Sequence, residues 1–230
     1  MMLQGRHLIP TIKINHASRI GTAVLLRSQG YGYIVTARHL VEGLRAAERI
    51  LVRRGDGWRP VEVQDVRYGD DNRIDDIAVL SVPEVAHAQA VDDDLVMMAL
   101  TVGQAVAYCG FPLSLEGVAP DGHDWPMALV KGGIYSGSVR MQERMVHLFD
   151  AVNNVGFSGG PIFAQDVDGT PKLVAIVSGY EFDRDLEVTR LVPGGEREKV
   201  PDLFVRPNSG FMRAVPIRRA QELIAQFEVQ

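Results

Sequence analysis

Short runs of apolar and β-branched residues, separated by Gly, Asp and Asn, recur along most of the chain. Strands are expected at 8–14, 21–26, 31–37, 49–54, 60–66, 76–82, 105–110, 133–141, 145–151, 172–180 and 210–216. Many short strands with turns between them are typical of a barrel or a sandwich, and not of strands that alternate with helices. The pattern therefore predicts an all-β protein.

One segment near the end of the chain has helical spacing. Ile217, Ala220, Ile224 and Phe227 repeat at intervals of three and four, and Pro216 stands at a suitable first helical position. We expect a C-terminal helix over 216–228 that packs its apolar stripe against the barrels.

Two stretches are expected to be long loops. Residues 181–208 are rich in charges, Gly and Pro, and residues 114–126 form a second candidate. Loops of this length are usually either functional or disordered. One hypothesis is that such a loop keeps a nearby site disordered until a partner or substrate binds, and a flexible surface loop is the alternative.

Composition indicates the cellular compartment and argues against some classes of binding partner. The 230 residues carry a net charge of −5, which argues against a general nucleic-acid binder. Cys109 is the single cysteine, so no intramolecular disulfide forms. The N-terminal residues do not form a secretion signal, and no apolar run approaches the roughly 18 residues that span a bilayer. These features favour a cytoplasmic protein without membrane attachment.

Metal and cofactor chemistry has little support in the sequence. The acidic stretches 68–76 and 90–95 match neither an EF-hand loop nor the His/Cys spacing of zinc sites. They are interpreted as solvated turns. We expect no metal and no cofactor.

The stretch GFSGGP at 156–161 has two interpretations. It is a glycine-rich turn between strands, or it is a loop that presents Ser158 as a nucleophile, with glycines where backbone and substrate approach closely. From average residue usage, a chance match to G-x-S-G-G-P in this chain has a probability of about one in a thousand or less. The pattern is strong, although it is not sufficient alone.

A serine nucleophile needs a base, and the base needs a carboxylate that fixes its tautomer. His39 follows the apolar strand 31–37, and Asp75 and Asp76 precede the strand that ends at residue 82. Singly, a histidine after a strand is usually a satisfied surface or core residue, and an acidic pair at a strand start is usually a turn. Their occurrence together, in the order His, Asp, Ser, favours a catalytic set.

These segments resemble the trypsin-like, chymotrypsin-fold serine proteases, nearest the disulfide-free bacterial branch that includes the high-temperature-requirement (Deg) proteases. The similar motifs are GTAVLLRSQGYGYIVTARHLV, DDIAVLSV and DAVNNVGFSGGPIF, followed by LVAIVSGY and GFMRAVP. The similarity spans most of residues 15–220. It implies two six-stranded antiparallel β-barrels with a C-terminal helix, and a serine endopeptidase that cleaves protein or peptide substrates.

The resemblance also implies residue roles. Ser158 would be the nucleophile, His39 the general base and acid, and Asp76, which directly precedes Ile-Ala, the residue that orients His39. The backbone N–H groups of Gly156 and Ser158 would form the oxyanion hole. Substrate would contact Val152, Asn153, Ser178 and Gly179.

The implied domain organisation is one peptidase domain over 1–230. Its two barrel subdomains are expected at roughly 8–110 and 111–215, followed by the helix at 216–228. No PDZ-like segment is expected after that helix.

Two departures from the family pattern concern regulation and geometry. Phe157 stands where zymogen-type relatives carry an Asp that pairs with a freed N-terminal amine, so activation by that ion pair is not expected. Arg38 replaces a small residue before His39. Two alternatives to a self-sufficient peptidase remain open: a catalytically silent pseudoprotease that binds protein, and a peptidase effector of a larger system with an activating protein partner.

Overall fold

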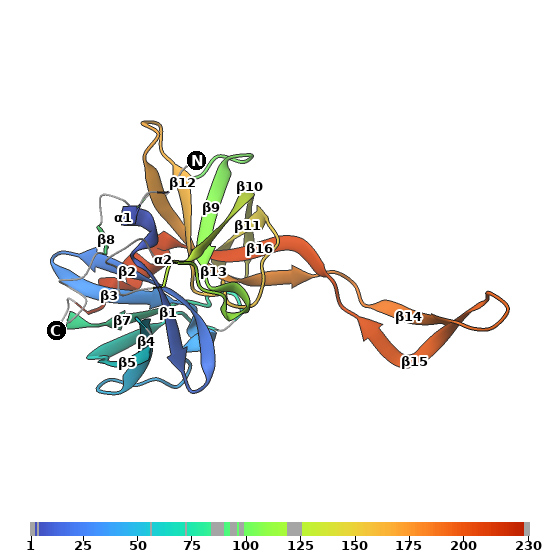
Figure 1. Cartoon of the computed structure of the whole chain (residues 1–230). Helices are drawn as coiled ribbons and strands as arrows, with labels where there is room; N and C mark the ends of the chain where they lie inside the picture. The colour runs from blue at the N-terminus through green and yellow to red at the C-terminus, as the bar shows by residue number, and fades with distance from the viewer. Residues whose placement is uncertain are drawn as a thin grey trace.

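The computed structural model describes residues 3, 5–55, 57–71, 73–83, 90–92, 96, 99–118 and 126–227. These residues form two β-sheet halves and a C-terminal helix, and a long ribbon projects from the second half (Figure 1). The expected all-β class with two barrel-like halves is confirmed. The expected loop at 114–126 lies mostly outside the described residues.

The first half is built from strands β1 to β8. Their bounds are β1 Thr11–His16, β2 Arg19–Ser28, β3 Tyr31–Thr36, β4 Arg49–Arg54, β5 Gly57–Glu62, β6 Asp65–Tyr68, β7 Ala78–Ser81 and β8 Val91–Asp92. Seven strands follow the order β5-β4-β1-β2-β3-β7-β6, and β8 pairs with β2 in parallel. This half has more strands than the expected six, because the run at 60–66 is divided between β5 and β6 and β8 is added.

The second half is a closed six-stranded barrel. It contains β9 Ala105–Gly110, β10 Leu129–Met141, β11 Arg144–Asp150, β12 Pro161–Gln165, β13 Pro171–Phe182 and β16 Asn208–Pro216, in the order β10-β11-β16-β13-β12-β9. The expected subdomain boundary at residue 110 placed β9 in the first half. In the structure β9 pairs with β10 and β12, so it belongs to the second barrel.

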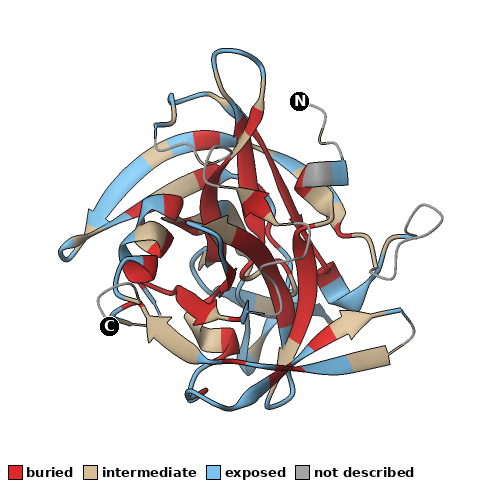
Figure 2. Cartoon of the chain, turned by 90° about the vertical axis from the view of Figure 1, so that its left-hand side faces the viewer, coloured by how far each residue is buried: buried red, intermediate tan, exposed pale blue. Residues whose placement is uncertain are grey.

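Apolar side chains fill each half and also the space between them. One cluster lies within the first half and another within the second barrel. A third joins residues of both halves, including Val24, Val79, Cys109 and Phe163. Figure 2 shows the buried segments meeting in the middle of the molecule, with exposed residues at the hairpin ends. Burial raises the pKa of the Cys109 thiol, which therefore stays protonated and unreactive.

The C-terminal helix α2 completes the shared core. It spans Ile217–Ile224 and buries Ile217, Ala220, Leu223 and Ile224. The helix is shorter than expected because Pro216 is the N-cap and helical structure ends at Ile224; residue 228 lies outside the described residues. A four-residue helix, α1 Gly5–Leu8, was not predicted.

The long loop expected at 181–208 is a β-ribbon instead. Within 181–208, strand β14 Leu186–Leu191 pairs with β15 Arg197–Val205 in antiparallel register, and the pair projects away from the barrels (Figure 1). Charges that suggest a loop in the sequence form ion pairs between the strands here: Arg190 pairs with Glu198 directly opposite, and Glu187 with Lys199 on the diagonal. The expectation of an unstructured connection was therefore wrong.

His147 on β11 gives the second barrel a pH-dependent stability. Burial lowers the pKa of its imidazole from 6.5 to about 4, and its Nδ1 lies 2.7 Å from Ser138 Oγ. Because the unfolded chain binds more protons between these pH values, stability is fully present above pH 6.5 and is lost as the pH falls towards 4. We expect a loss of about 3 kcal/mol that is absent from His147→Gln, measured by denaturant unfolding across this range. Equal pH slopes in the two proteins would contradict it.

Candidate active site

Strand pairing in the first half brings His39 to Asp76. Strand β3 ends at Thr36, and a 3₁₀ helix, Arg38–Leu40, presents His39 directly after it. Asp76 lies just before β7, which pairs with β3 through Thr36 and Ala78. The turn after one strand and the approach to its neighbour therefore meet at one edge of the sheet.

The contacts between the two residues are short and specific. His39 Nδ1 lies 2.6 Å from Asp76 Oδ2, and the backbone N–H of His39 donates to Asp76 Oδ1 at 2.9 Å. Asp76 is 2% exposed, whereas the His39 side chain is 37% exposed. Because a carboxylate only accepts hydrogen bonds, this contact favours the tautomer protonated at Nδ1. The exposed Nε2 is then free to accept a proton.

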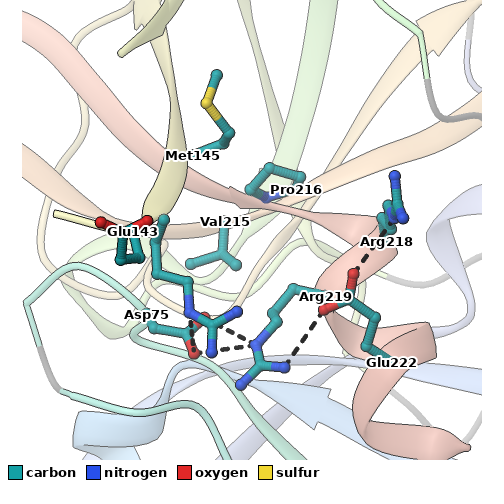
Figure 3. Close-up of a pocket in the computed structure, with 9 residues that line it drawn as sticks. Asp75, Glu143, Met145, Val215, Pro216, Arg218, Arg219 and Glu222 are labelled. Carbon is teal, nitrogen blue, oxygen red and sulfur yellow. Dashed lines mark hydrogen bonds and ion pairs between the residues drawn. The ribbon is translucent and has the colours of Figure 1, made fainter. Parts of the chain in front are cut away.

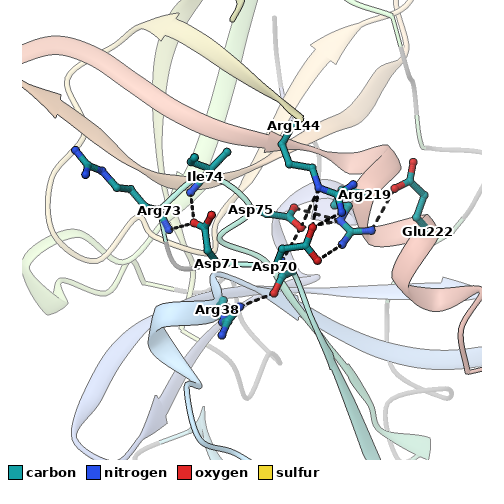
Figure 4. A network of polar contacts seen from close by, with 10 residues as sticks. Arg38, Asp70, Asp71, Arg73, Ile74, Asp75, Arg144, Arg219 and Glu222 are labelled. Atoms are coloured by element: carbon teal, nitrogen blue, oxygen red, sulfur yellow. Dashed lines mark hydrogen bonds and ion pairs between the residues drawn. The ribbon is translucent and has the colours of Figure 1, made fainter. Parts of the chain in front are cut away.

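Asp75 has a different set of partners from its neighbour. It is also 2% exposed, but it accepts hydrogen bonds from Arg219 Nε of α2, at 2.9 and 3.2 Å, and from the backbone N–H of Asp70 at 2.8 Å. Figure 4 shows this network, in which Arg144 of β11 also pairs with Asp70. The Arg144 hydrogen bond lowers the pKa of Asp70. Asp75 thus ties the first half to the second barrel and to α2.

A cavity of about 210 Å³ opens beside this network (Figure 3). It is lined by Asp75, Glu143, Arg144, Met145, Val215, Pro216, Arg218, Arg219 and Glu222. Its buried acid is already paired with arginine, and none of the expected catalytic residues lines it. We therefore regard it as a structural junction.

Ser158 lies in the loop between β11 and β12, which is docked onto the first half. The backbone N–H of Thr22 on β2 donates to the Ser158 carbonyl at 3.0 Å. Thr22 Oγ1 donates to the Gly156 carbonyl at 2.6 Å and accepts from the N–H of Phe111 at 3.2 Å. One buried threonine therefore fixes the loop on both sides of its serine.

Two glycines make this close docking feasible. Gly156 has φ +106°, and a Cβ there would lie 2.2 Å from the carbonyl oxygen of Phe111. Gly159 has φ +81°, and a Cβ there would lie 2.0 Å from the Thr22 carbonyl oxygen and 3.0 Å from the N atom of Ala37. Any side chain at either position would push the loop away. Ala37 is two residues before His39, so this loop reaches the chain segment that carries the histidine.

The buried side chain of Phe157 anchors the loop that carries Ser158. It is fully buried, and its ring makes an edge contact with Tyr108 at 4.9 Å between centroids. The position therefore holds an apolar core side chain and makes no ion pair. Arg38, the other departure, donates to the Gly69 carbonyl at 2.6 Å and lies over the Tyr68 ring.

The structure brings together some of the expected groups and not others. Within the described residues, the Ser158 hydroxyl makes no hydrogen bond to His39, and the N–H groups of Gly156 and Ser158 have no acceptor. His39 and Asp76 are joined directly, while Ser158 reaches their half through its backbone.

The residues expected to contact substrate lie on β13 and in the segment that follows β11. Asn153 is buried, and its Nδ2 donates to the Gly179 carbonyl at 3.0 Å; Ser178 is also buried. Val152 is 55% exposed, and its carbonyl accepts from the hydroxyl of Tyr108 at 2.8 Å. Burial raises the pKa of Tyr108 to about 12, which keeps this hydroxyl a donor.

Two further residues hold this region in place through hydrogen bonds, and neither of them was predicted from the sequence. Thr22 is one, and Asn208 is the other, since its Nδ2 donates to the Asn153 carbonyl at 2.8 Å. Each is a short polar residue in a strand, with a partner more than fifty residues away. No local pattern marks such a role.

Neither a metal centre nor a membrane helix is found in the part of the chain that the structure describes. No three His, Cys, Asp or Glu side chains there are grouped to hold a metal ion. No helix in these ranges has the length and apolarity needed to cross a membrane.

The two β-barrel halves, the His39–Asp76 pair and the docked serine loop define a chymotrypsin-fold class of protein. The chain belongs to the family of trypsin-like peptidase domains, whose model matches residues 21–176. The expected family is thereby confirmed, and a peptidase is supported at the family level. No curated protein matches the chain.

Solved structures of serine proteases share the fold at low sequence identity. The HtrA-type protease AlgW with tripeptide is 21% identical, with a TM-score of 0.58 over 96% of this chain and 60% of that one. The inactive form of a mutant of Rv3671c from M. tuberculosis is 17% identical, with a TM-score of 0.56 over 94% and 85%. The thermostable serine protease AL20 from an extremophilic microorganism is 13% identical, with a TM-score of 0.58 over 98% and 100%.

Proposed function

We propose that the chain is a serine endopeptidase that hydrolyses peptide bonds of protein or peptide substrates through an acyl-enzyme. The observation that supports this most is the contact of His39 Nδ1 with buried Asp76 at 2.6 Å, beside a serine loop docked on the same half. A catalytically silent pseudoprotease would not need a buried carboxylate that fixes one tautomer of an exposed imidazole.

In the proposed reaction Ser158 Oγ attacks the substrate carbonyl carbon while His39 Nε2 takes its proton. Asp76 accepts from Nδ1–H and stabilises the imidazolium that forms. The N–H groups of Gly156 and Ser158 donate to the developing oxyanion. His39 then gives the proton to the leaving amine, and water, activated by the same imidazole, hydrolyses the acyl-enzyme to the acid and free Ser158.

We propose that the second barrel supplies the surface that contacts the substrate. Asn153 and Asn208 hold Gly179 and the loop before Ser158 in a fixed arrangement. Ser178 and Gly179 on β13 then offer backbone groups to an extended peptide, and Val152 is exposed for side-chain contact. Pairing of a peptide with a strand is a common mode of peptide recognition.

The proposed setting is a bacterial cytoplasm, where the peptidase is an effector of a larger system with an activating protein partner. The single, buried Cys109 agrees with a reducing compartment. Buried Phe157 supports regulation by something other than an ion pair at that position. The absence of nucleic-acid and membrane partners stays a prediction from the sequence.

Active-site labelling tests the proposal. A fluorophosphonate probe is expected to label the intact protein and to label neither Ser158→Ala nor His39→Ala, because reaction needs both the hydroxyl and its base. Ser28→Ala, at the far end of β2, is the matched control and should label like the original protein. Failure of the intact protein to label, alone and with candidate partners, would favour the catalytically silent pseudoprotease.

A further inference from the structure

The ribbon of residues 183–206, here called the arm, is the part of the structure whose role the peptidase fold does not explain. Its strands β14 and β15 pair only with each other among the described residues, and nearly all of their residues are exposed. A two-stranded ribbon alone is at best marginally stable in water, and its edges offer unpaired N–H and C=O groups.

Several apolar side chains of the arm are exposed. Leu186 is 45% exposed, Phe204 56% and Val205 54%. Exposed leucine, valine and phenylalanine gathered on one projecting element are typical of a protein interaction surface.

The charges of the arm are balanced within it. Six acidic and five basic side chains leave residues 183–206 with a net charge of −1. Ion pairs within the arm are Arg190–Glu198, Lys199–Glu187 and Arg206–Asp185. A strongly acidic or basic partner would have to break these pairs. A second copy of the arm, whose charges are balanced in the same way, meets no such cost.

The two edges of the arm differ. On β15, Pro201 lacks an N–H group, and Asp202 has φ +59°, so that edge is interrupted. The residues of β14 contain neither proline nor a left-handed residue. The pairing register shifts between Glu187 and Thr189, where residues 200–203 of β15 face the single residue Val188, so the irregularity lies mainly in β15. Strand β14 therefore offers the more regular edge for pairing with another strand.

We propose that the arm is a self-association element: β14 pairs antiparallel with β14 of a second copy of this chain and forms a four-stranded sheet. A two-fold axis perpendicular to a sheet keeps each residue on its face, so such a pair is centred on one residue and its own counterpart. Centring on Val188 sets the two Val188 side chains opposite each other and Leu186 of each copy opposite Arg190 of the other, all on one face. Val205, opposite Leu186 in the arm, adds to the apolar part of that face.

The exposed area of the molecule agrees with such a contact. A compact monomer of 25.3 kDa is expected to expose about 10,300 Å², whereas this chain exposes 11992 Å². The excess of about 1,700 Å² is roughly twice the 800 Å² or so that each partner buries in a standard interface.

Cysteine cross-linking tests the register directly. Paired residues on antiparallel strands have Cα atoms about 4.5 to 5.5 Å apart, within the range that a disulfide bridges. Val188→Cys is expected to form a disulfide-linked dimer under mild oxidation, whereas Thr189→Cys, on the opposite face, and Val167→Cys, exposed on another hairpin, are not. Cys109 is buried, so we do not expect it to form a disulfide with a second copy. Linking of all three variants to the same extent, or of none, would overturn the proposal.

Sedimentation equilibrium tests the association itself. The original protein is expected to show a concentration-dependent species of twice the chain mass. Val188→Asp, which sets two carboxylates opposite each other at the two-fold axis, should raise the dissociation constant at least about tenfold. Leu191→Asp, at a leucine that is 74% exposed on the other face of β14, should leave it nearly unchanged. Circular dichroism checks that the variants fold. A monomer at all concentrations, or equal effects of the two changes, would contradict a dimer through this face. Neither test depends on peptidase activity.

Discussion

Replacing Asp76 with asparagine is expected to lower kcat for peptide hydrolysis by about four orders of magnitude while the protein stays folded. The amide can donate as well as accept, so it no longer selects the Nδ1–H tautomer that the 2.6 Å contact of His39 with Asp76 favours. Nε2 is then protonated and cannot act as base. The measurement is steady-state hydrolysis of a peptide substrate, with folding followed by denaturant unfolding.

The neighbouring acid provides a matched control for this change. Asp75→Asn removes the same charge one residue earlier, but it weakens the contact with Arg219 on α2. We expect a loss of about 2 kcal/mol in stability, because a largely buried arginine loses a partner, and a kcat within about tenfold of the original. Similar losses of kcat in the two variants would show that Asp76 has no separate role.

Replacing Phe157 with alanine is expected to destabilise the protein by about 3 to 5 kcal/mol. The side chain is fully buried and packs on Tyr108, and a Cβ at Gly110 would lie 2.7 Å from its ring, so the site has little room to rearrange. Because the ring supports the loop of Ser158, activity should fall together with stability.

Chemical denaturation measures this effect, with Phe204→Ala as the control. Phe204 is 56% exposed on the arm, and its truncation should change stability by less than about 0.5 kcal/mol. A small effect of Phe157→Ala would mean that the loop is held by its backbone contacts with Thr22 alone.

The sequence predicts the class of the fold because strand alternation and turn residues are local signals. The closeness of His39 and Asp76 follows from the same signals once β3 and β7 are neighbours, since each residue stands at the end of a strand. The choice of Asp76 over Asp75 came from the family motif. The structure supplies the physical difference, since one acid faces the imidazole and the other faces Arg219.

The remaining features depend on contacts that no local pattern encodes. Thr22 fixes Gly156 across 134 positions, and its residue type is common in any strand. The arm was misinterpreted because its charges and glycines resemble a loop until their cross-strand register is known. β9 was assigned to the first subdomain because its sequence does not show which strand it pairs with.

The core shared between the halves has a consequence for how such a protein is made. Its apolar residues come from β2 near the start of the chain, from β9 in the middle and from α2 at residues 217–224. A ribosome-bound chain that lacks the last of these cannot close the space between the halves. The proposed peptidase would therefore gain activity only after α2 has been synthesised and has left the ribosome, which delays proteolysis until both halves are present.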